Sequence, residues 1–252
     1  ETGPSEPVDA RRFKLVRPPV VLLHGLHDFG TSWQWILISD PRYVVETPDY
    51  SNSHGDHFLS NRLQLRAAAD RVLHRTRAKG VAATAVDAFG HSMGGILSRL
   101  YTTNEITVAG RTYKTGYLAP LNFHRGNVHK LTSVNTPHWG SPVSDMLTSV
   151  DGSESLAGTI ARTASGRCID CGAVFDLRTD SAVLRALNAM FVPVPAHALW
   201  GDGASFTPNN YYTADKASSA GWCGVTLKTL MSGPSDAVVP VLVDVSRSMR
   251  LA

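Results

Sequence analysis

The chain has 252 residues, of which 43% are hydrophobic, so it is long enough to bury a substantial core. Its formal net charge is +3, and its Lys and Arg residues are spread along the sequence rather than clustered, which argues against a nucleic-acid-binding protein. No apolar run approaches the roughly 18 residues of a membrane-spanning helix, and no signal-peptide pattern opens the sequence.

The first strand is predicted after a flexible leader, residues 1–17, which a cleaved signal could have preceded. The apolar run PPVVLLHGL, from Pro18 to Leu26, predicts a strand that ends at His24 and Gly25. Backbone N–H groups in the turn that follows can point at a negatively charged oxygen. For His24 we expect a role in bracing this loop rather than in catalysis.

Two further elements are predicted before the central motif. Residues 43–45 predict a short strand. Residues 61–79 predict a helix, because apolar residues recur on one face and Gly80 follows as a stop signal. The apolar face of this helix comprises Leu65, Ala69, Val72 and Leu73.

The strongest chemical signal is the pattern Gly-x-Ser-x-Gly at residues 90–94. It follows an apolar stretch, residues 81–89, that predicts a strand, and it precedes apolar residues at helical spacing. A serine in this context projects from a sharp turn between strand and helix, and the glycines relieve crowding between the two backbones. Ser92 is therefore the predicted nucleophile, and the alternative is an ordinary turn hydroxyl.

Attack by Ser92 would need hydrogen-bond donors for the oxygen that becomes negative. We expect the backbone N–H groups of Leu26 and Met93, because sites of this kind take one donor from the residue after the nucleophile and one from the loop after an early strand. No metal and no cofactor is expected, since the chemistry uses neither.

A strand is predicted over residues 128–134, and a long insertion follows it over residues 141–191. Two apolar stripes at helical spacing lie in the insertion: Val143, Met146, Leu147 and Val150, and then Val183, Leu184, Leu187 and Met190. We interpret residues 141–165 as a cap or lid that presents apolar surface to acyl chains, the alternative being ordinary helices packed on the core. The second stripe is expected in the core.

The three cysteines are Cys168 and Cys171, in the motif CIDC, and Cys223. There is no second C-x-x-C to complete a zinc site, and no thioredoxin-like pattern around the first. We expect one structural disulfide, either between Cys168 and Cys171 or between one of these and Cys223. Such a bridge would suit a secreted protein.

The next strand is predicted over residues 192–200, with His197 in the core. Strands that alternate with helices predict an α/β protein with a mainly parallel sheet, helices on both faces, and a ligand site at the carboxyl ends of the strands.

The segments VVLLHGLHDFGTSW, FGHSMGGILSRLY, SVNTPHWGSP, DLRTDSAVLRALN and SGPSDAVVP together resemble the lipase and esterase branch of the α/β-hydrolases. NTPHWGSP is similar to a segment of bacterial triacylglycerol lipases, of the lecithin-cholesterol acyltransferase group and of glycosylphosphatidylinositol deacylase-like proteins. The resemblance implies one α/β-hydrolase domain over residues 18–252. It also implies Ser92 as the nucleophile and Asp236, in SDAVVP, as the acid of a Ser-His-Asp triad.

The same resemblance implies a histidine after Asp236, but none of the residues from Ala237 to Ala252 is histidine. We expect the natural chain to continue beyond Ala252 and the base to lie there. The alternatives are a silent homologue that has lost its base and an internal histidine, such as His138, that replaces it.

The resulting hypothesis is a serine carboxylic ester hydrolase that acts on lipid-like acyl esters through an acyl-enzyme. We expect a secreted monomer that contacts lipid surfaces at most transiently. A catalytically silent binding module is the alternative outside enzymes, and acyl transfer or thioester hydrolysis are the alternatives within them.

Overall fold

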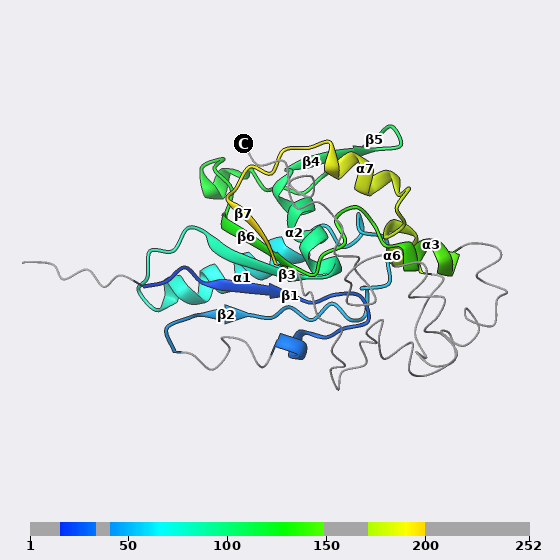
Figure 1. Cartoon of the computed structure of the whole chain (residues 1–252). Coiled ribbons are helices and arrows are strands. Elements are labelled where there is room, and N and C mark those ends of the chain that lie inside the picture. Colours follow the sequence, from blue (N-terminus) through cyan, green and yellow to red (C-terminus); the bar gives the residue numbers. More distant parts are fainter. Residues whose placement is uncertain (1–15, 34–40, 149–170, 200–252) are drawn as a thin grey trace, which may run out of the picture.

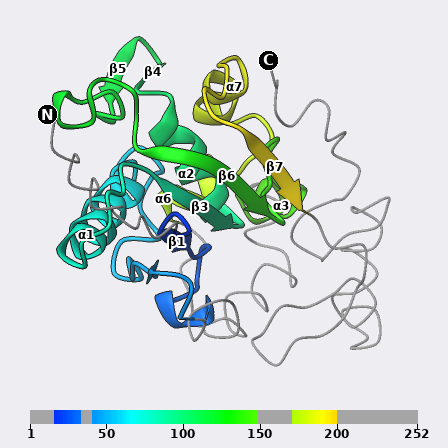
Figure 2. The ribbon, with the colours of Figure 1, turned by 90° about the vertical axis from the view of Figure 1, so that its left-hand side faces the viewer.

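The computed structural model describes residues 16–33, 41–148 and 171–199. Within them, five strands form a sheet in the order β2-β1-β3-β6-β7, and every pairing between neighbours is parallel. The arrowheads of β3, β6 and β7 point to the same side in Figure 2, so the carboxyl ends of these strands share one edge. The predicted α/β class and parallel sheet are confirmed. The strands are β1 (Val20–Leu23), β2 (Val45–Glu46), β3 (Val86–His91), β6 (Val128–Val134) and β7 (Ala196–Leu199).

Both faces of β1 are buried. Val21 and Leu23 belong to the main core, which also contains residues of helices α1 (Gln64–Ala78) and α2 (Met93–Thr102). Val20 and Leu22 point into a second cluster with Trp33, which lies in the short 3-10 helix η1 (Gly30–Trp33). Burial on both faces explains why this strand reads as an uninterrupted apolar run. Figure 1 shows the sheet with α1 and α2 beside it.

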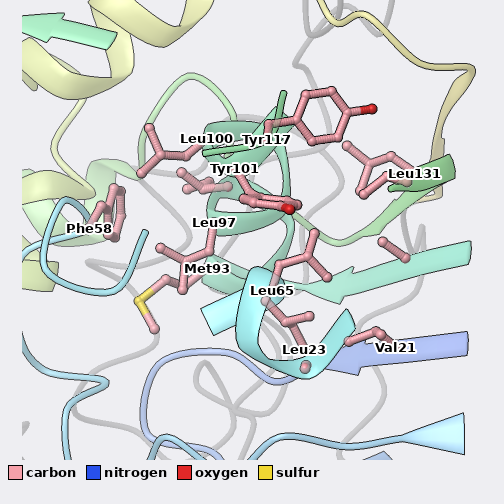
Figure 3. Packing of buried hydrophobic residues seen from close by; sticks show 14 of the residues in the cluster. Val21, Leu23, Phe58, Leu65, Met93, Leu97, Leu100, Tyr101, Tyr117 and Leu131 are labelled. Carbon is pink, nitrogen blue, oxygen red and sulfur yellow. The ribbon is translucent and has the colours of Figure 1, made fainter. Parts of the chain in front are cut away.

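Helix α2, which follows Ser92, is the most enclosed helix of the fold. All ten of its residues are buried. Its residues Met93, Leu97, Leu100 and Tyr101 share the main core with strand and helix residues such as Leu23 and Leu65 (Figure 3). This packing fixes the start of α2, and with it the position of Ser92, against the rigid centre of the molecule.

The insertion is described in part. Helix α3 (Pro142–Thr148) contains the first three residues of the first apolar stripe. Helices α6 (Gly172–Asp176) and α7 (Ala182–Asn188) come later in the insertion. Val183, Leu184 and Leu187 of α7 are buried, so the second stripe is in the core as predicted. Residues 149–170 lie outside the described residues, and the lid remains a prediction.

Several predicted boundaries were wrong for a physical reason. Strand β3 begins at Val86 rather than at residue 81, because its neighbours β1 and β6 offer no partner before that point: Val20 lies opposite Asp87, and Val128 lies opposite Val86. Helix α1 begins at Gln64 rather than at residue 61, and β7 is shorter than residues 192–200.

Two further features differ from the prediction. His197 is exposed on β7, which is an edge strand of the described sheet, and is therefore not a core residue. An antiparallel hairpin of β4 (Glu105–Val108) and β5 (Arg111–Lys114) was not predicted. Among the described helices, none is long and apolar enough to cross a membrane.

Candidate active site

Ser92 lies in the turn between β3 and α2, with φ 51° and ψ −124°. A positive φ is uncommon for a residue with a side chain and costs conformational energy, so it persists only where the surroundings impose it. One such constraint is visible: the Ser92 N–H donates to the carbonyl of Val134 at 2.9 Å, beyond the last residue of β3. The serine is therefore held in a strained turn at the carboxyl edge of the sheet.

The two glycines of the motif lie where backbones approach each other. A Cβ on Gly94 would lie 2.5 Å from the carbonyl oxygen of Leu23, and a Cβ on Gly90 would clash with the backbone of Gly94 and Gly95. A side chain at Gly94 would force α2 away from β1, and one at Gly90 would force β3 and α2 apart. The spacing Gly-x-Ser-x-Gly is thus required by packing as well as by the turn.

The loop after β1 lies directly against the serine. A Cβ on Gly25 would come within 2.9 Å of the Ser92 Cβ. Among the described residues, no acceptor takes a hydrogen bond from the backbone N–H of Leu26 or of Met93. A donor to a ligand must be free of such a bond, and within the described residues both N–H groups meet that condition.

His24 braces that loop, as the sequence predicts. Its Nδ1 lies 2.9 Å from the Gly25 carbonyl, its Nε2 accepts from the Tyr50 N–H at 3.2 Å, and its ring stacks on Tyr50 with centroids 3.8 Å apart. An acceptor role for Nε2 means that the ring is neutral with its proton on Nδ1. Burial lowers the pKa of His24, which keeps it neutral.

His91, next to Ser92, is engaged with the loop after β1 as well. Its Nδ1 lies 3.9 Å from a carboxylate oxygen of Asp28, and its ring packs edge-on against Trp33 at a centroid distance of 6.3 Å. The other carboxylate oxygen of Asp28 accepts from the Phe29 N–H at 3.0 Å and from the Ser32 hydroxyl. Asp28 thereby links His91, which precedes the turn at Ser92, to η1.

Both ring nitrogens of His138 are bonded to groups other than Ser92. Nδ1 accepts from the Arg99 guanidinium at 3.0 Å, and Nε2 donates to the Ser133 hydroxyl at 3.1 Å. The ring is 2% exposed, and burial followed by the charge of Arg99 lowers its pKa well below the usual value. These contacts give His138 a structural position inside the core.

The remaining predicted site residue, Asp236, lies outside the described residues, as do Cys168 and Cys223. Among the acid and histidine pairs that the sequence did not predict is that of His57 and Asp176, with Nδ1 3.1 Å from Oδ1. The partners are 119 residues apart, so no local pattern could have revealed them. No group of three or more metal-ligating side chains occurs in the part of the chain that the structure describes.

Comparison with known proteins identifies the fold. No protein-family model and no curated protein matches the sequence. The mature form of the Bacillus licheniformis lipase BlEst2 is similar over 96% of this chain and 82% of that chain, with a TM-score of 0.56 and 17% identity. Its propeptide form is similar over 96% of this chain and 45% of that chain, with a TM-score of 0.53 and 17% identity.

Phospholipase PlaB from Legionella pneumophila matches over 74% of this chain and 39% of that chain, with a TM-score of 0.45 and 14% identity. α/β-Hydrolases also occur among the similar structures. The parallel sheet and the likeness to the two BlEst2 structures together show the α/β-hydrolase fold that the resemblance implies. At these identities, the likeness establishes architecture and leaves the chemistry to the site.

Proposed function

We propose that this protein is a serine carboxylic ester hydrolase that acts on lipid-like acyl esters. The observation that carries the proposal is the strained conformation of Ser92, held between β3 and a fully buried helix beside a loop with available N–H donors. An active-site serine of this fold occupies such a turn. The lipase resemblance of the segment at residues 135–142 supports lipid-like substrates.

In the proposed mechanism the Ser92 hydroxyl attacks the acyl carbonyl and gives its proton to a histidine. The Leu26 and Met93 N–H groups donate to the oxygen that becomes negative, which lowers the barrier to the tetrahedral intermediate. Collapse releases the alcohol and leaves the acyl group on Ser92, and water then hydrolyses this ester by the same route. Asp236 orients the histidine and stabilises its protonated form.

The histidine of this mechanism is not assigned to a residue of the sequence. His24 and His138 are held by other partners, and no histidine occurs between Ala237 and Ala252.

A fluorophosphonate probe tests the nucleophile. The probe should label the protein, and Ser92→Ala should abolish the labelling because the attacking oxygen is gone. Ser60→Ala is the matched control, since it removes an exposed hydroxyl and should leave labelling unchanged. Equal labelling of Ser92→Ala and the parent protein would reject Ser92.

The engagement of His24 and His138 by groups other than Ser92 favours a second candidate, a binding module that keeps the fold but lacks catalysis. This candidate predicts that the fluorophosphonate probe does not label the protein, whereas the hydrolase predicts labelling that Ser92→Ala abolishes. The two functions are thus separated by one measurement.

Substrate class is tested with p-nitrophenyl esters of increasing acyl length and a matched series of peptide amides. The proposal predicts that esters are cleaved faster than amides and that the rate rises with acyl length before it levels off. Faster cleavage of the amides would contradict the lipase-like assignment.

A further inference from the structure

An open cavity of about 490 Å³ lies between the β4–β5 hairpin, helices α6 and α7, and the loop before α1. Its volume falls in the range of sites for small ligands, roughly 300–1,000 Å³. Neither Ser92 nor the loop after β1 contributes to its wall. The cavity is therefore a separate feature from the site described above.

Two arginines of this wall gather at one aromatic ring. The guanidinium carbons of Arg62 and Arg111 lie 5.9 Å and 5.2 Å from the ring centroid of Tyr113. Arg62 is held by bonds to the backbone carbonyls of Leu59 at 2.6 Å and Lys114 at 3.1 Å. The ring and the carbonyls thus preorganise one guanidinium, while Arg111 remains exposed on the hairpin.

Within the described residues, neither guanidinium forms an ion pair with a carboxylate. Two cations beside the same ring repel each other, and a concave wall of protein concentrates their field. An oxyanion placed between them would remove the repulsion and could accept several charge-assisted hydrogen bonds.

Of the residues that line the wall, one is a carboxylate, Asp176, and it forms no ion pair with either arginine. Its two oxygens are engaged by His57 Nδ1 at 3.1 Å and by the Phe58 N–H at 2.7 Å, and its side chain is 16% exposed. Burial raises the pKa of Asp176, while its bonds to Phe58 and His57 lower it. These bonds direct the carboxylate to His57 and Phe58, so the two arginines remain available to a ligand's oxygens.

The rest of the wall is suited to an apolar group. Phe175 is 43% exposed here, and Leu59 and Val108 line the same cavity. We propose that this cavity binds an amphiphilic oxyanion, a phosphate or carboxylate carried on an apolar body, with Arg62 and Arg111 holding the oxygens. The site does not depend on the proposed hydrolase activity.

Binding of phenyl phosphate, measured by calorimetry, tests the proposal, with inorganic phosphate and phenol as the two halves of the ligand. Arg111→Gln should weaken binding of phenyl phosphate about tenfold, because it removes one charge-assisted contact. No hydrogen bond or ion pair joins the Arg111 side chain to another described residue, so this variant should fold normally. Arg125→Gln, which removes an exposed arginine outside the cavity, should bind as the parent does. Ser92→Ala should also bind unchanged.

Phenyl phosphate that binds more tightly than inorganic phosphate or phenol, and loses affinity in Arg111→Gln, supports the proposal. Vesicles containing phosphatidylglycerol then distinguish the sources: binding that phenyl phosphate displaces identifies a lipid headgroup, and no binding to vesicles identifies a soluble ligand. Three results would each overturn the proposal. They are an affinity for inorganic phosphate equal to that for phenyl phosphate, no binding of phenyl phosphate at millimolar concentrations, and equal effects of Arg111→Gln and Arg125→Gln.

Discussion

The side chain of Arg99 shows how single residues constrain one another inside this fold. It is 2% exposed and donates to His138 at 3.0 Å, to the side chain of Asn188 at 3.0 Å and to the Leu187 carbonyl at 3.3 Å. Burial lowers its pKa to about 10, so it remains protonated near neutral pH. A buried cation needs acceptors, and His138 can accept only while its ring is neutral.

This requirement predicts a dependence of stability on pH. The pKa of His138 is lowered in the folded protein, so below its usual value of 6.5 the unfolded chain binds a proton that the folded protein does not. The free energy of unfolding should therefore be highest above that pH and fall as the pH decreases, by up to about 1.4 kcal/mol per pH unit for this group.

Urea denaturation between pH 8 and pH 5 measures the effect. His138→Gln keeps a donor and an acceptor but does not titrate, so its unfolding free energy should depend less on pH than that of the parent. His24 titrates in both proteins, and the difference between them isolates His138. Identical slopes in the two proteins would contradict the assignment.

A second prediction at this scale concerns the glycines around Ser92. Gly90→Ala should lower the free energy of unfolding by about 3 kcal/mol or more, because its Cβ would overlap the backbone of Gly94 and Gly95 and no side-chain movement can relieve this. Gly110→Ala is the control: with φ +77° and no atom within 4 Å of the new Cβ, it should cost only about 1 kcal/mol. Equal losses of unfolding free energy in the two variants, measured by urea denaturation, would show that the turn at Ser92 can relax around the added methyl group.

At the scale of helices and strands, α7 anchors the C-terminal part of the insertion. Leu187 is 1% exposed, and Leu187→Ala should destabilise the protein by about 2–5 kcal/mol, since it leaves a cavity in the main core. Leu63→Ala, at a leucine that is 39% exposed just before α1, should cost well under half as much. Thermal or urea denaturation of the pair decides whether α7 belongs to the cooperative core.

Sequence patterns predicted both β3 and β6, which have a neighbouring strand on each side in the sheet. The bounds of β6 agree with the prediction residue for residue, and the turn at Ser92 was expected from its motif. Strand β3 was predicted too long because apolar residues before Val86 have no neighbour to pair with, a property that belongs to β1 and β6. The pairing partners therefore determine where β3 begins, which the local sequence pattern does not reveal.

The β4–β5 hairpin was missed although a signal was present. Ala109 and Gly110 both adopt positive φ between two short segments of strand-forming residues, as a two-residue hairpin turn requires. An alanine is a poor indicator of such a turn. The pairing of Asp176 with His57 and the gathering of Arg62 and Arg111 follow from this tertiary arrangement, so no sequence window could contain them.

For the whole molecule, the cysteines offer an inexpensive measurement. We predict one intrachain disulfide among Cys168, Cys171 and Cys223, because such a bridge would tie the insertion or join it to the C-terminal region. Peptide mapping under non-reducing conditions should recover one linked pair. Recovery of three unmodified thiols would contradict this prediction.

The place of β3 in the strand order has a consequence for how the molecule opens. It is the third of five strands, and its parallel neighbours come from residues 20–23 and 128–134, distant along the chain on either side. Its amide protons can meet solvent only when these non-local pairings break together, so they should be among the slowest to exchange with deuterium. Local opening of the outer elements should leave Ser92 in place. Ser92 should lose its backbone conformation only when the whole sheet unfolds cooperatively.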